Sequence, residues 1–173
     1  MAIEKDRTLA ALKGAIQMEI EGRAYYLQAS EECSNEAGKK LLRQLASEED
    51  IHLQKCEKIY EAIQGGKTWP NLRDAPGKVS VPGTLFREAA DNLSAPESEF
   101  DSVRIAIEME NKTYDFYQKQ ARAATSRAER RFYEALTAEE NKHKLVLLDY
   151  DEYLKDPASW FVNREHPSLD GGY

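Results

Sequence analysis

The sequence contains little cysteine and no long apolar run. Its two cysteines, Cys33 and Cys56, cannot build a metal site of four thiolates. On antiparallel helices they would lie about 21 Å and about 6 Å to opposite sides of a shared centre, too far apart for a disulfide. We therefore predict two separate thiols, buried or half-buried. No segment is apolar enough to cross a membrane, and residues 1–7 lack the apolar core of a signal peptide, so we expect a cytoplasmic protein.

The sequence also lacks an excess of basic residues. Its formal net charge is −7, with 24 Lys and Arg against 31 Asp and Glu. Nucleic acids and anionic membranes are bound by basic surfaces, so we expect neither as a partner. The 173 residues, of which 41% are hydrophobic and 32% are charged, suit a single helix-rich domain with amphipathic elements.

The most informative pattern is a set of residues that occurs twice, with a constant offset of 91 positions. In each half a glutamate is followed by a tyrosine and then by a Glu-x-x-His motif. The first set is Glu19, Tyr26, Glu49 and His52, and the second set is Glu110, Tyr117, Glu140 and His143. The remaining histidine, His166, lies outside the repeat, and we expect it at the surface. Because chance would not preserve one offset through two separate segments, we interpret the repeat as one site built by two related halves.

Apolar periodicity and capping residues predict four helices, at about 6–33, 36–63, 94–124 and 126–155. Helices commonly begin at Ser or Asn caps and end at glycines. The boundaries are predicted from the Ser34-Asn35 break, from Gly65 and Gly66, and from two capping boxes, Ser94-x-x-Glu97 and Ser126-x-x-Glu129.

These helices predict an all-α fold, a four-helix bundle with a long crossover between its second and third helices. We expect the bundle to occupy residues 1–155, with helical hairpins at about 6–64 and 94–155 and the crossover at 65–93. The crossover must run the length of a bundle of about 40 Å, which places the second and third helices parallel. We expect one short helical segment within it, at 84–92. Residues 156–173 form a tail in which Trp160 and Phe161 are the expected packing anchors.

The repeated residues have the chemistry of a metal site. A Glu and a His that are three residues apart lie on one face of a helix, so each motif presents both side chains together. Four carboxylates and two imidazoles suit a pair of iron atoms inside a four-helix bundle. We expect Glu49 and Glu140 to bridge two iron ions, with a manganese or mixed-metal pair as the alternative. One end would be completed by Glu19 and His52, and the other by Glu110 and His143.

The two tyrosines fit the same geometry. Tyr26 lies seven residues after Glu19, nearly two helical turns, and Tyr117 is placed identically after Glu110. Helical side chains lean toward the N-terminus of their helix, so each hydroxyl can reach back toward the metal-bound carboxylates. We predict that Tyr26 and Tyr117 donate hydrogen bonds that fix glutamate ligands, and that they assist catalysis from there.

Neighbouring glutamates compete for the same roles. Glu21 and Glu108 are excluded as ligands because neither is matched by a glutamate in the other half. Glu48 and Glu139 are matched, and each is four residues from a histidine, so spacing leaves them open as alternatives to the glutamates that follow them. Without the repeat, most of these glutamates would be interpreted as solvated residues and the tyrosines as core aromatics.

The repeated segments resemble the ferritin-like superfamily, and most closely the rubrerythrin group. The resemblance covers the four helices and rests on Met18-Glu19 through Tyr25-Tyr26, Leu45-Ala46-Ser47-Glu48-Glu49-Asp50-Ile51-His52, Met109-Glu110 through Phe116-Tyr117, and Leu136 through Glu139-Glu140-Asn141-Lys142-His143. It implies a non-haem di-iron centre that reduces hydrogen peroxide or dioxygen and cycles between diferrous and diferric states.

The chain departs from the rubrerythrin pattern in two respects. Rubrerythrins carry a rubredoxin-like module with four cysteines, which two cysteines cannot form. They also carry an extra Glu three residues after the third-helix ligand, and Thr113 stands there in this chain. The remaining symmetric set of six ligands is closer to that of bacterioferritins. We therefore expect electrons from a separate donor, such as a rubredoxin or a reductase, and a homodimer as the assembly.

Three functions compete. The first is a di-iron peroxidase or oxidase that protects against oxidative stress. The second is a ferroxidase or iron-handling protein of the bacterioferritin type, which uses the same six ligands. The third is a helical scaffold without metal, which is disfavoured because four unpaired glutamates facing a core are costly.

Overall fold

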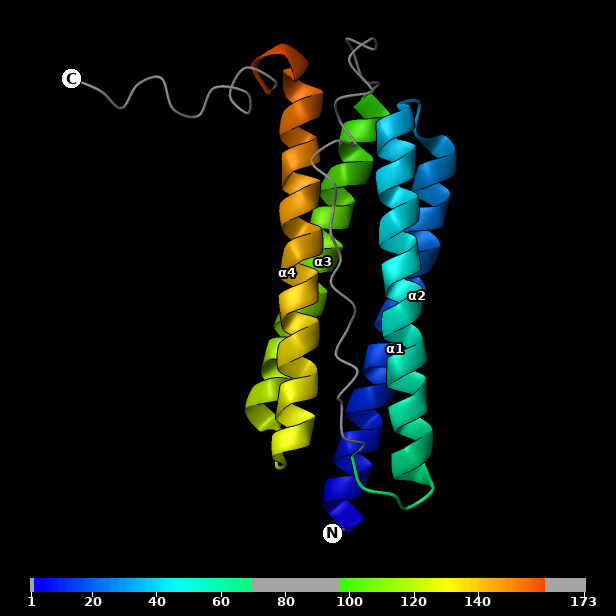
Figure 1. Cartoon of the computed structure of the whole chain (residues 1–173), viewed down its shortest axis with the longest axis vertical. Coiled ribbons are helices and arrows are strands. Elements are labelled where there is room, and N and C mark those ends of the chain that lie inside the picture. The colour runs from blue at the N-terminus through cyan, green and yellow to red at the C-terminus, as the bar shows by residue number, and fades with distance from the viewer. Residues whose placement is uncertain (1, 70–96, 161–173) are drawn as a thin grey trace, which may run out of the picture.

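The computed structural model describes residues 2–69 and 97–160, which form an all-α bundle (Figure 1). Four long helices make up almost all of it: α1 (Ala2–Glu32), α2 (Glu36–Gln64), α3 (Glu97–Ala123) and α4 (Arg127–Lys155). A further helical turn covers residues 157–160. The predicted fold class is therefore confirmed.

The helices form two antiparallel hairpins, α1 with α2 and α3 with α4. Figure 1 shows α2 and α3 running in one direction, and α1 and α4 running in the other. This is the arrangement expected when a long connection joins two hairpins. The middle of every helix therefore lies at one level of the bundle, where residues from all four can meet.

The helix ends follow from local sequence. The Asn35 side chain accepts hydrogen bonds from the backbone N–H groups of Ala37 (2.8 Å) and Gly38 (3.3 Å), which caps α2. At its other end Gly66 has a positive φ of 77°, and the Lys67 N–H donates to the Ala62 carbonyl over 2.9 Å. This is the left-handed glycine ending that the paired glycines predict.

The first helix begins earlier than predicted. It starts at Ala2 rather than at about residue 6, because side chains of its first turns are tied to the ends of other helices. Lys5 Nζ donates to the Gln64 carbonyl over 3.0 Å, and the Arg7 guanidinium pairs with Glu129 at 2.8 Å. Some predictions lie outside the described residues. They are the short helical segment at 84–92, the cap at Ser94, the packing of Phe161 and the surface position of His166.

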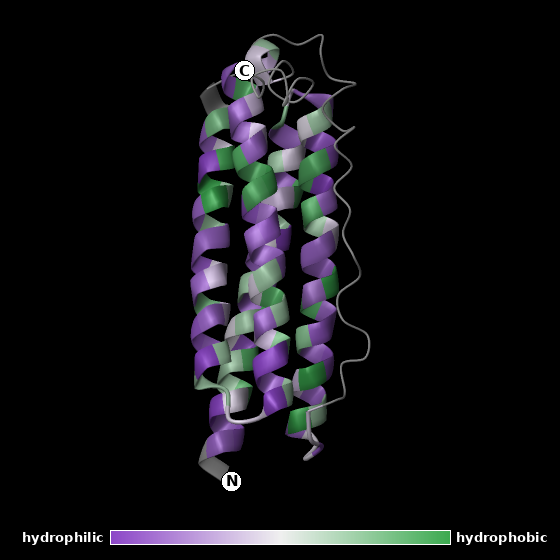
Figure 2. Ribbon diagram, turned by 60° about the vertical axis from the view of Figure 1, so that its left-hand side comes forward, coloured by the Kyte–Doolittle hydropathy of each residue, from purple (hydrophilic) through white to green (hydrophobic). Residues whose placement is uncertain are grey.

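Two apolar clusters make up the core. One contains Tyr26, Leu45 and Leu147, and the other contains Leu12, Cys56 and Tyr117. Along each helix the residues of the metal motif lie between members of the two clusters, so a polar layer separates two apolar ones. Figure 2 shows hydrophilic and hydrophobic residues alternating along the helices, as expected of amphipathic elements.

The two cysteines lie in different halves of this core. Cys33 belongs to the Tyr26 cluster and Cys56 to the Tyr117 cluster, and both are free, buried thiols, as predicted. None of the helices in the described ranges combines the length and the apolar character that a membrane crossing requires. In the tail, Trp160 is buried and its ring contacts Tyr153 at 5.6 Å between centroids.

Candidate metal centre

The six repeated Glu and His residues come together in the polar layer at the middle of the bundle. Each half of the repeat contributes residues from both helices of its hairpin. None of the six side chains is more than 3% exposed. Buried carboxylates are rare in proteins unless they are paired or bind metal. The cluster consists of Glu19, Glu49, His52, Glu110, Glu140 and His143.

The ligand atoms form two overlapping groups. One contains Glu19, Glu49, His52 and Glu140, and the other contains Glu110 and His143 together with the same Glu49 and Glu140. Within each group the potential ligand atoms lie within 4.8 Å of one another. Two carboxylates shared by two groups are the arrangement required to bridge a pair of metal ions.

The open choice between Glu48 and Glu49 is resolved by their positions. Glu49 belongs to both groups, with Oε1 at 3.2 Å from His143 Nδ1. Glu48 lies behind the His143 ring, where its Oε2 is 2.9 Å from Nε2. A carboxylate at Nε2 orients the imidazole so that Nδ1 faces the cluster. Glu48 is therefore a partner of His143 rather than a seventh candidate ligand.

The corresponding contact in the other half is different. Glu139, which matches Glu48 in the repeat, accepts a hydrogen bond from Lys142 Nζ at 2.8 Å. His52 presents Nδ1 to the cluster, 3.5 Å from Glu19 Oε2 and 3.3 Å from Glu140 Oε1. The two halves therefore match in their six central residues but differ in the contacts of Glu48 and Glu139.

Each tyrosine reaches across to the other half. The Tyr26 hydroxyl donates to Glu110 Oε1, and the Tyr117 hydroxyl donates to Glu19 Oε1. This crossed pairing arises because α1 and α3 are antiparallel, so a tyrosine beyond one glutamate lies next to the helix that carries the other. The Oε2 atom of each glutamate has no hydrogen-bond partner within the described ranges.

Unsatisfied polar atoms test whether the cluster fits a metal. Eight buried side-chain atoms have no hydrogen-bond partner within the described ranges, and five of them lie in the cluster: Glu19 Oε2, Glu110 Oε2, Glu140 Oε1, His52 Nδ1 and His143 Nδ1. Buried polar atoms without partners are unusual and costly. All five belong to the two groups and are oxygen or imidazole nitrogen, the donor atoms that iron and manganese bind. The residues fit a di-metal centre.

The carboxyl groups influence one another strongly. Burial, followed by a hydrogen bond and repulsion with Glu49, raises the pKa of Glu19 to about 8. Burial and the charges of Glu49 and Glu110 raise the pKa of Glu140 well above its usual range. Burial also opposes ionisation of Glu49, but hydrogen bonds with Glu19 and His143 outweigh it and lower the pKa of Glu49. The surroundings therefore favour the protonated form of Glu19 and the ionised form of Glu49.

The imidazoles are held in their charged form by the carboxylates. Burial lowers the pKa of each histidine, but interactions with the carboxylates of the surrounding glutamates outweigh it. For His52 the largest of these involves Glu140, and for His143 it involves Glu110. Both pKa values lie well above the usual range. Protons thus neutralise the cluster where metal ions are not bound.

Metal affinity should therefore rise with pH. At neutral pH the raised pKa values of Glu19, Glu140 and both histidines mean that these groups carry protons, which a metal ion must displace. Each displaced proton contributes about a tenfold gain in affinity per pH unit, and the contribution of Glu19 ends near its pKa of about 8. Competition titrations with Mn²⁺ between about pH 6 and about pH 8 would measure the slope. An affinity independent of pH would contradict this picture.

The asymmetry around the histidines gives a second prediction. Replacing Glu48 by Ala removes the carboxylate that orients His143, and loss of such a partner lowers metal affinity about 10- to 100-fold. Glu139→Ala is the matched control, because Glu139 contacts Lys142. Its affinity should stay close to that of the unmodified protein. Equal losses in both variants, measured against a competing chelator, would show that charge rather than orientation determines the effect.

Sequence reasoning missed several of these contacts. The role of Glu48 had a signal, since it repeats as Glu139, but the signal could not distinguish a ligand from a supporting residue. The buried Glu129 was interpreted only as part of a capping box. Ser126 does cap α4 by accepting from the Glu129 N–H over 3.1 Å, whereas the Glu129 carboxylate binds Arg7. Nothing in the spacing of Arg7 and Glu129 predicts that pair.

Comparison with known proteins places this geometry in a family. The family model described as Rubrerythrin matches residues 10–150, a range that contains all six clustered residues and both tyrosines. Searches of curated proteins and of solved structures give no significant match. The fold, the cluster and the family match agree with the ferritin-like bundle expected from the sequence.

Proposed function

Because the chain belongs to the rubrerythrin family, we propose that it is a di-iron oxidoreductase that reduces hydrogen peroxide, or dioxygen, and so protects against oxidative stress. The observation that carries this proposal is the pair of ligand groups sharing Glu49 and Glu140. A single metal ion would require only one group, and a scaffold would require neither. The proposed metal is iron, because carboxylate and imidazole ligands suit it, with manganese as the alternative.

Each residue has a defined task in this proposal. Glu19 and His52 would hold one metal ion, Glu110 and His143 would hold the other, and Glu49 and Glu140 would bind both. When bound there, two iron ions supply the two electrons that convert hydrogen peroxide to two molecules of water.

The reaction also consumes two protons, and the tyrosines are placed to pass them on. Tyr26 and Tyr117 hydroxyls donate to Glu110 and Glu19, which hold one oxygen of each carboxylate in a fixed position. The apolar clusters on either side of the polar layer keep bulk water away from the reacting atoms. We propose that these hydroxyls, which contact two of the ligand glutamates, relay protons to the site.

A ferroxidase of the bacterioferritin type is the second candidate. It is favoured by Thr113, whose hydroxyl donates to the Met109 carbonyl of its own helix at 3.1 Å. A threonine engaged in this way adds no further carboxylate, so the symmetric set of six remains. Assembly size separates the candidates, because iron storage needs a shell and a peroxidase needs only the homodimer that we propose. Sedimentation of the purified protein would measure it.

An anaerobic titration with Fe²⁺ tests the proposal. We expect saturation at two iron ions per chain, followed by faster oxidation of the reduced centre by hydrogen peroxide than by dioxygen. Faster oxidation by dioxygen, with release of ferric mineral, would favour the ferroxidase. If no iron were bound even at excess Fe²⁺, both the peroxidase and the ferroxidase would be eliminated. The electron donor that restores the reduced centre is proposed to be a separate redox protein.

A further inference from the structure

Three aromatic rings connect the metal cluster to one end of the bundle. Tyr117, which donates to Glu19, stacks on Tyr133 with 6.0 Å between ring centroids and 28° between ring planes. Tyr133 in turn contacts Trp69 edge-on at 6.1 Å. Tyr117 and Tyr133 are fully buried. The contacts therefore form a continuous series of rings from a candidate metal ligand to the segment that follows α2.

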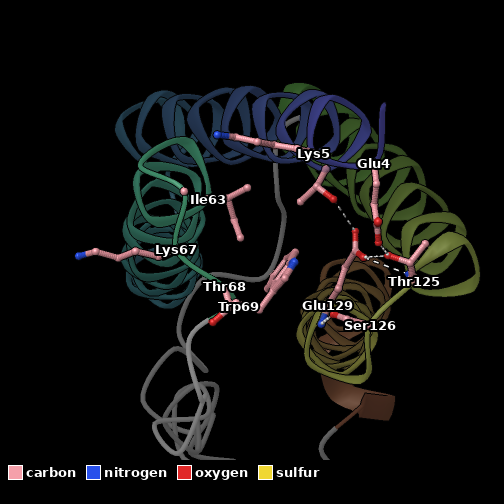
Figure 3. A pocket seen from close by; sticks show the side chains of 11 residues that line it. Glu4, Lys5, Ile63, Lys67, Thr68, Trp69, Thr125, Ser126 and Glu129 are labelled. Atoms are coloured by element: carbon pink, nitrogen blue, oxygen red, sulfur yellow. Dashed lines mark hydrogen bonds between the residues drawn. The ribbon is translucent and has the colours of Figure 1, made fainter. Parts of the chain in front are cut away.

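The outer end of this series lies at a pocket. Trp69 lines a cavity of about 310 Å³ together with Ile63, Thr8 and Glu129. Figure 3 shows the indole ring pointing into this pocket, between Ile63 on α2 and Glu129 on α4. Trp69 is only partly buried, so the pocket gives small molecules access to its ring. The series thus runs from the buried centre to solvent.

The related half of the protein serves as an internal comparison. The offset of 91 residues pairs Tyr117 with Tyr26 and Trp69 with Trp160, but it pairs Tyr133 with Leu42. Tyr26, Leu42 and Trp160 all lie in one core cluster, in the positions equivalent to the three rings. An aliphatic side chain therefore stands at the middle position there, and Trp160 contacts Tyr153, which stacks on Tyr150. Only one half keeps all three aromatic residues.

We propose that Tyr117, Tyr133 and Trp69 form a one-electron transfer path between the metal cluster and the pocket at Trp69. Electron transfer slows steeply with distance, and rings about 6 Å apart divide a long step into short ones. In the equivalent half Leu42 stands at the position of the middle ring. Its use by the metal centre rests on the function proposed above, whereas the path itself is a property of the three rings.

The hydroxyl groups determine where a radical would rest. Within the described ranges the Tyr133 hydroxyl has no hydrogen-bond partner, so no group is placed to receive its proton. The Tyr117 hydroxyl donates to Glu19 Oε1. When Trp69 has lost one electron and its indole proton, an electron from Tyr117 restores it. In the metal-loaded protein, in which Glu19 has given up its own proton, the Tyr117 proton passes to Glu19 Oε1, the indole regains a proton from solvent, and a neutral Tyr117 radical remains.

Pulse radiolysis with the azide radical tests the path without iron chemistry. Azide radicals take one electron from indole, and the Trp160→Phe variant leaves Trp69 as the only tryptophan. The protein is loaded with Zn²⁺, which has no redox chemistry. We expect the tryptophan radical absorption to decay as a tyrosyl radical absorption rises, at a rate independent of protein concentration. If Zn²⁺ does not bind, the metal proposal fails, and the transfer is measured in the protein as purified.

Further variants in this background identify the path. Tyr133→Leu copies the residue at the equivalent position, and we expect it to abolish the tyrosyl rise. Tyr133→Phe keeps the ring and should retain the rise, as should Tyr60→Phe, which removes another tyrosine packed against the same cluster. Tyr117→Phe preserves the fold with little change in volume and should abolish the rise. An undiminished rise in Tyr133→Leu or Tyr117→Phe, or no rise in the parent, would overturn the proposal.

Discussion

Replacing Glu140 by Ala should abolish the binding of both metal ions. Glu140 belongs to both ligand groups, so its loss removes a bridging oxygen donor from each. In the unmodified protein, metal binding should stabilise the fold by about 2.7 kcal/mol at a metal concentration about 100 times Kd. In Glu140→Ala this gain should disappear. Melting curves recorded with and without Fe²⁺ under anaerobic conditions measure the difference directly.

Two comparisons make this test specific. Without metal, Glu140→Ala should be no less stable than the unmodified protein, because burial and neighbouring charges already oppose ionisation of Glu140, as its raised pKa shows. Glu139→Ala removes the adjacent carboxylate, which lies outside both groups, and should keep the metal-dependent gain. A Glu140→Ala protein that still gained stability from two iron ions would disprove the bridging assignment.

The repeat explains why so much of the centre could be predicted from sequence. A Glu-x-x-His spacing determines which side chains share a helical face, and its doubling selects residues that meet only after folding. Glu49 and Glu140 could therefore be predicted as the shared carboxylates, with Glu48 and Glu139 left open as alternatives. The same spacing argument places the tyrosine hydroxyls near the glutamates, since side-chain direction in a helix is regular.

Contacts between the hairpins could not be predicted in this way. The choice of Glu48 or Glu49 depends on how α2 is rotated about its axis relative to α4, and both rotations satisfy the spacing. The crossed pairing of Tyr26 with Glu110 depends on the distance between α1 and α3. The early start of α1 depends on Arg7 finding Glu129 on another helix. Such contacts arise from tertiary packing, which a local pattern does not contain.

Packing is especially tight around Gly38, near the start of α2. The Tyr150 hydroxyl and Cys33 Sγ lie next to Gly38, and both donate to the buried carboxylate of Glu99. A third donor, Ser34 Oγ, is 3.0 Å from Glu99 Oε2. Together these contacts tie the turn between α1 and α2 to the first turns of α3 and to α4. The absence of a side chain at position 38 allows Tyr150 to approach the helix backbone.

Gly38→Ala should therefore destabilise the protein, although alanine normally favours a helix. A Cβ atom at position 38 would overlap the Tyr150 hydroxyl and would lie 2.7 Å from Cys33 Sγ. Overpacking of this kind costs about 1–3 kcal/mol. If Tyr150 moves away, Glu99 loses one of its three donors, and the lost hydrogen bond costs roughly 0.5–1.5 kcal/mol more. Urea unfolding of the metal-free protein would measure the loss.

Gly22→Ala provides the matched control within the same bundle. Gly22 is also buried in a helix, but a Cβ atom there would meet only Glu49, at an ordinary 3.5 Å. Alanine should then stabilise α1 by roughly 0.5–1 kcal/mol, because glycine loses more conformational freedom on folding. The two substitutions are chemically identical and should have opposite signs. If both stabilised the protein, the close approach of Tyr150 to Gly38 would not be a constraint on the fold.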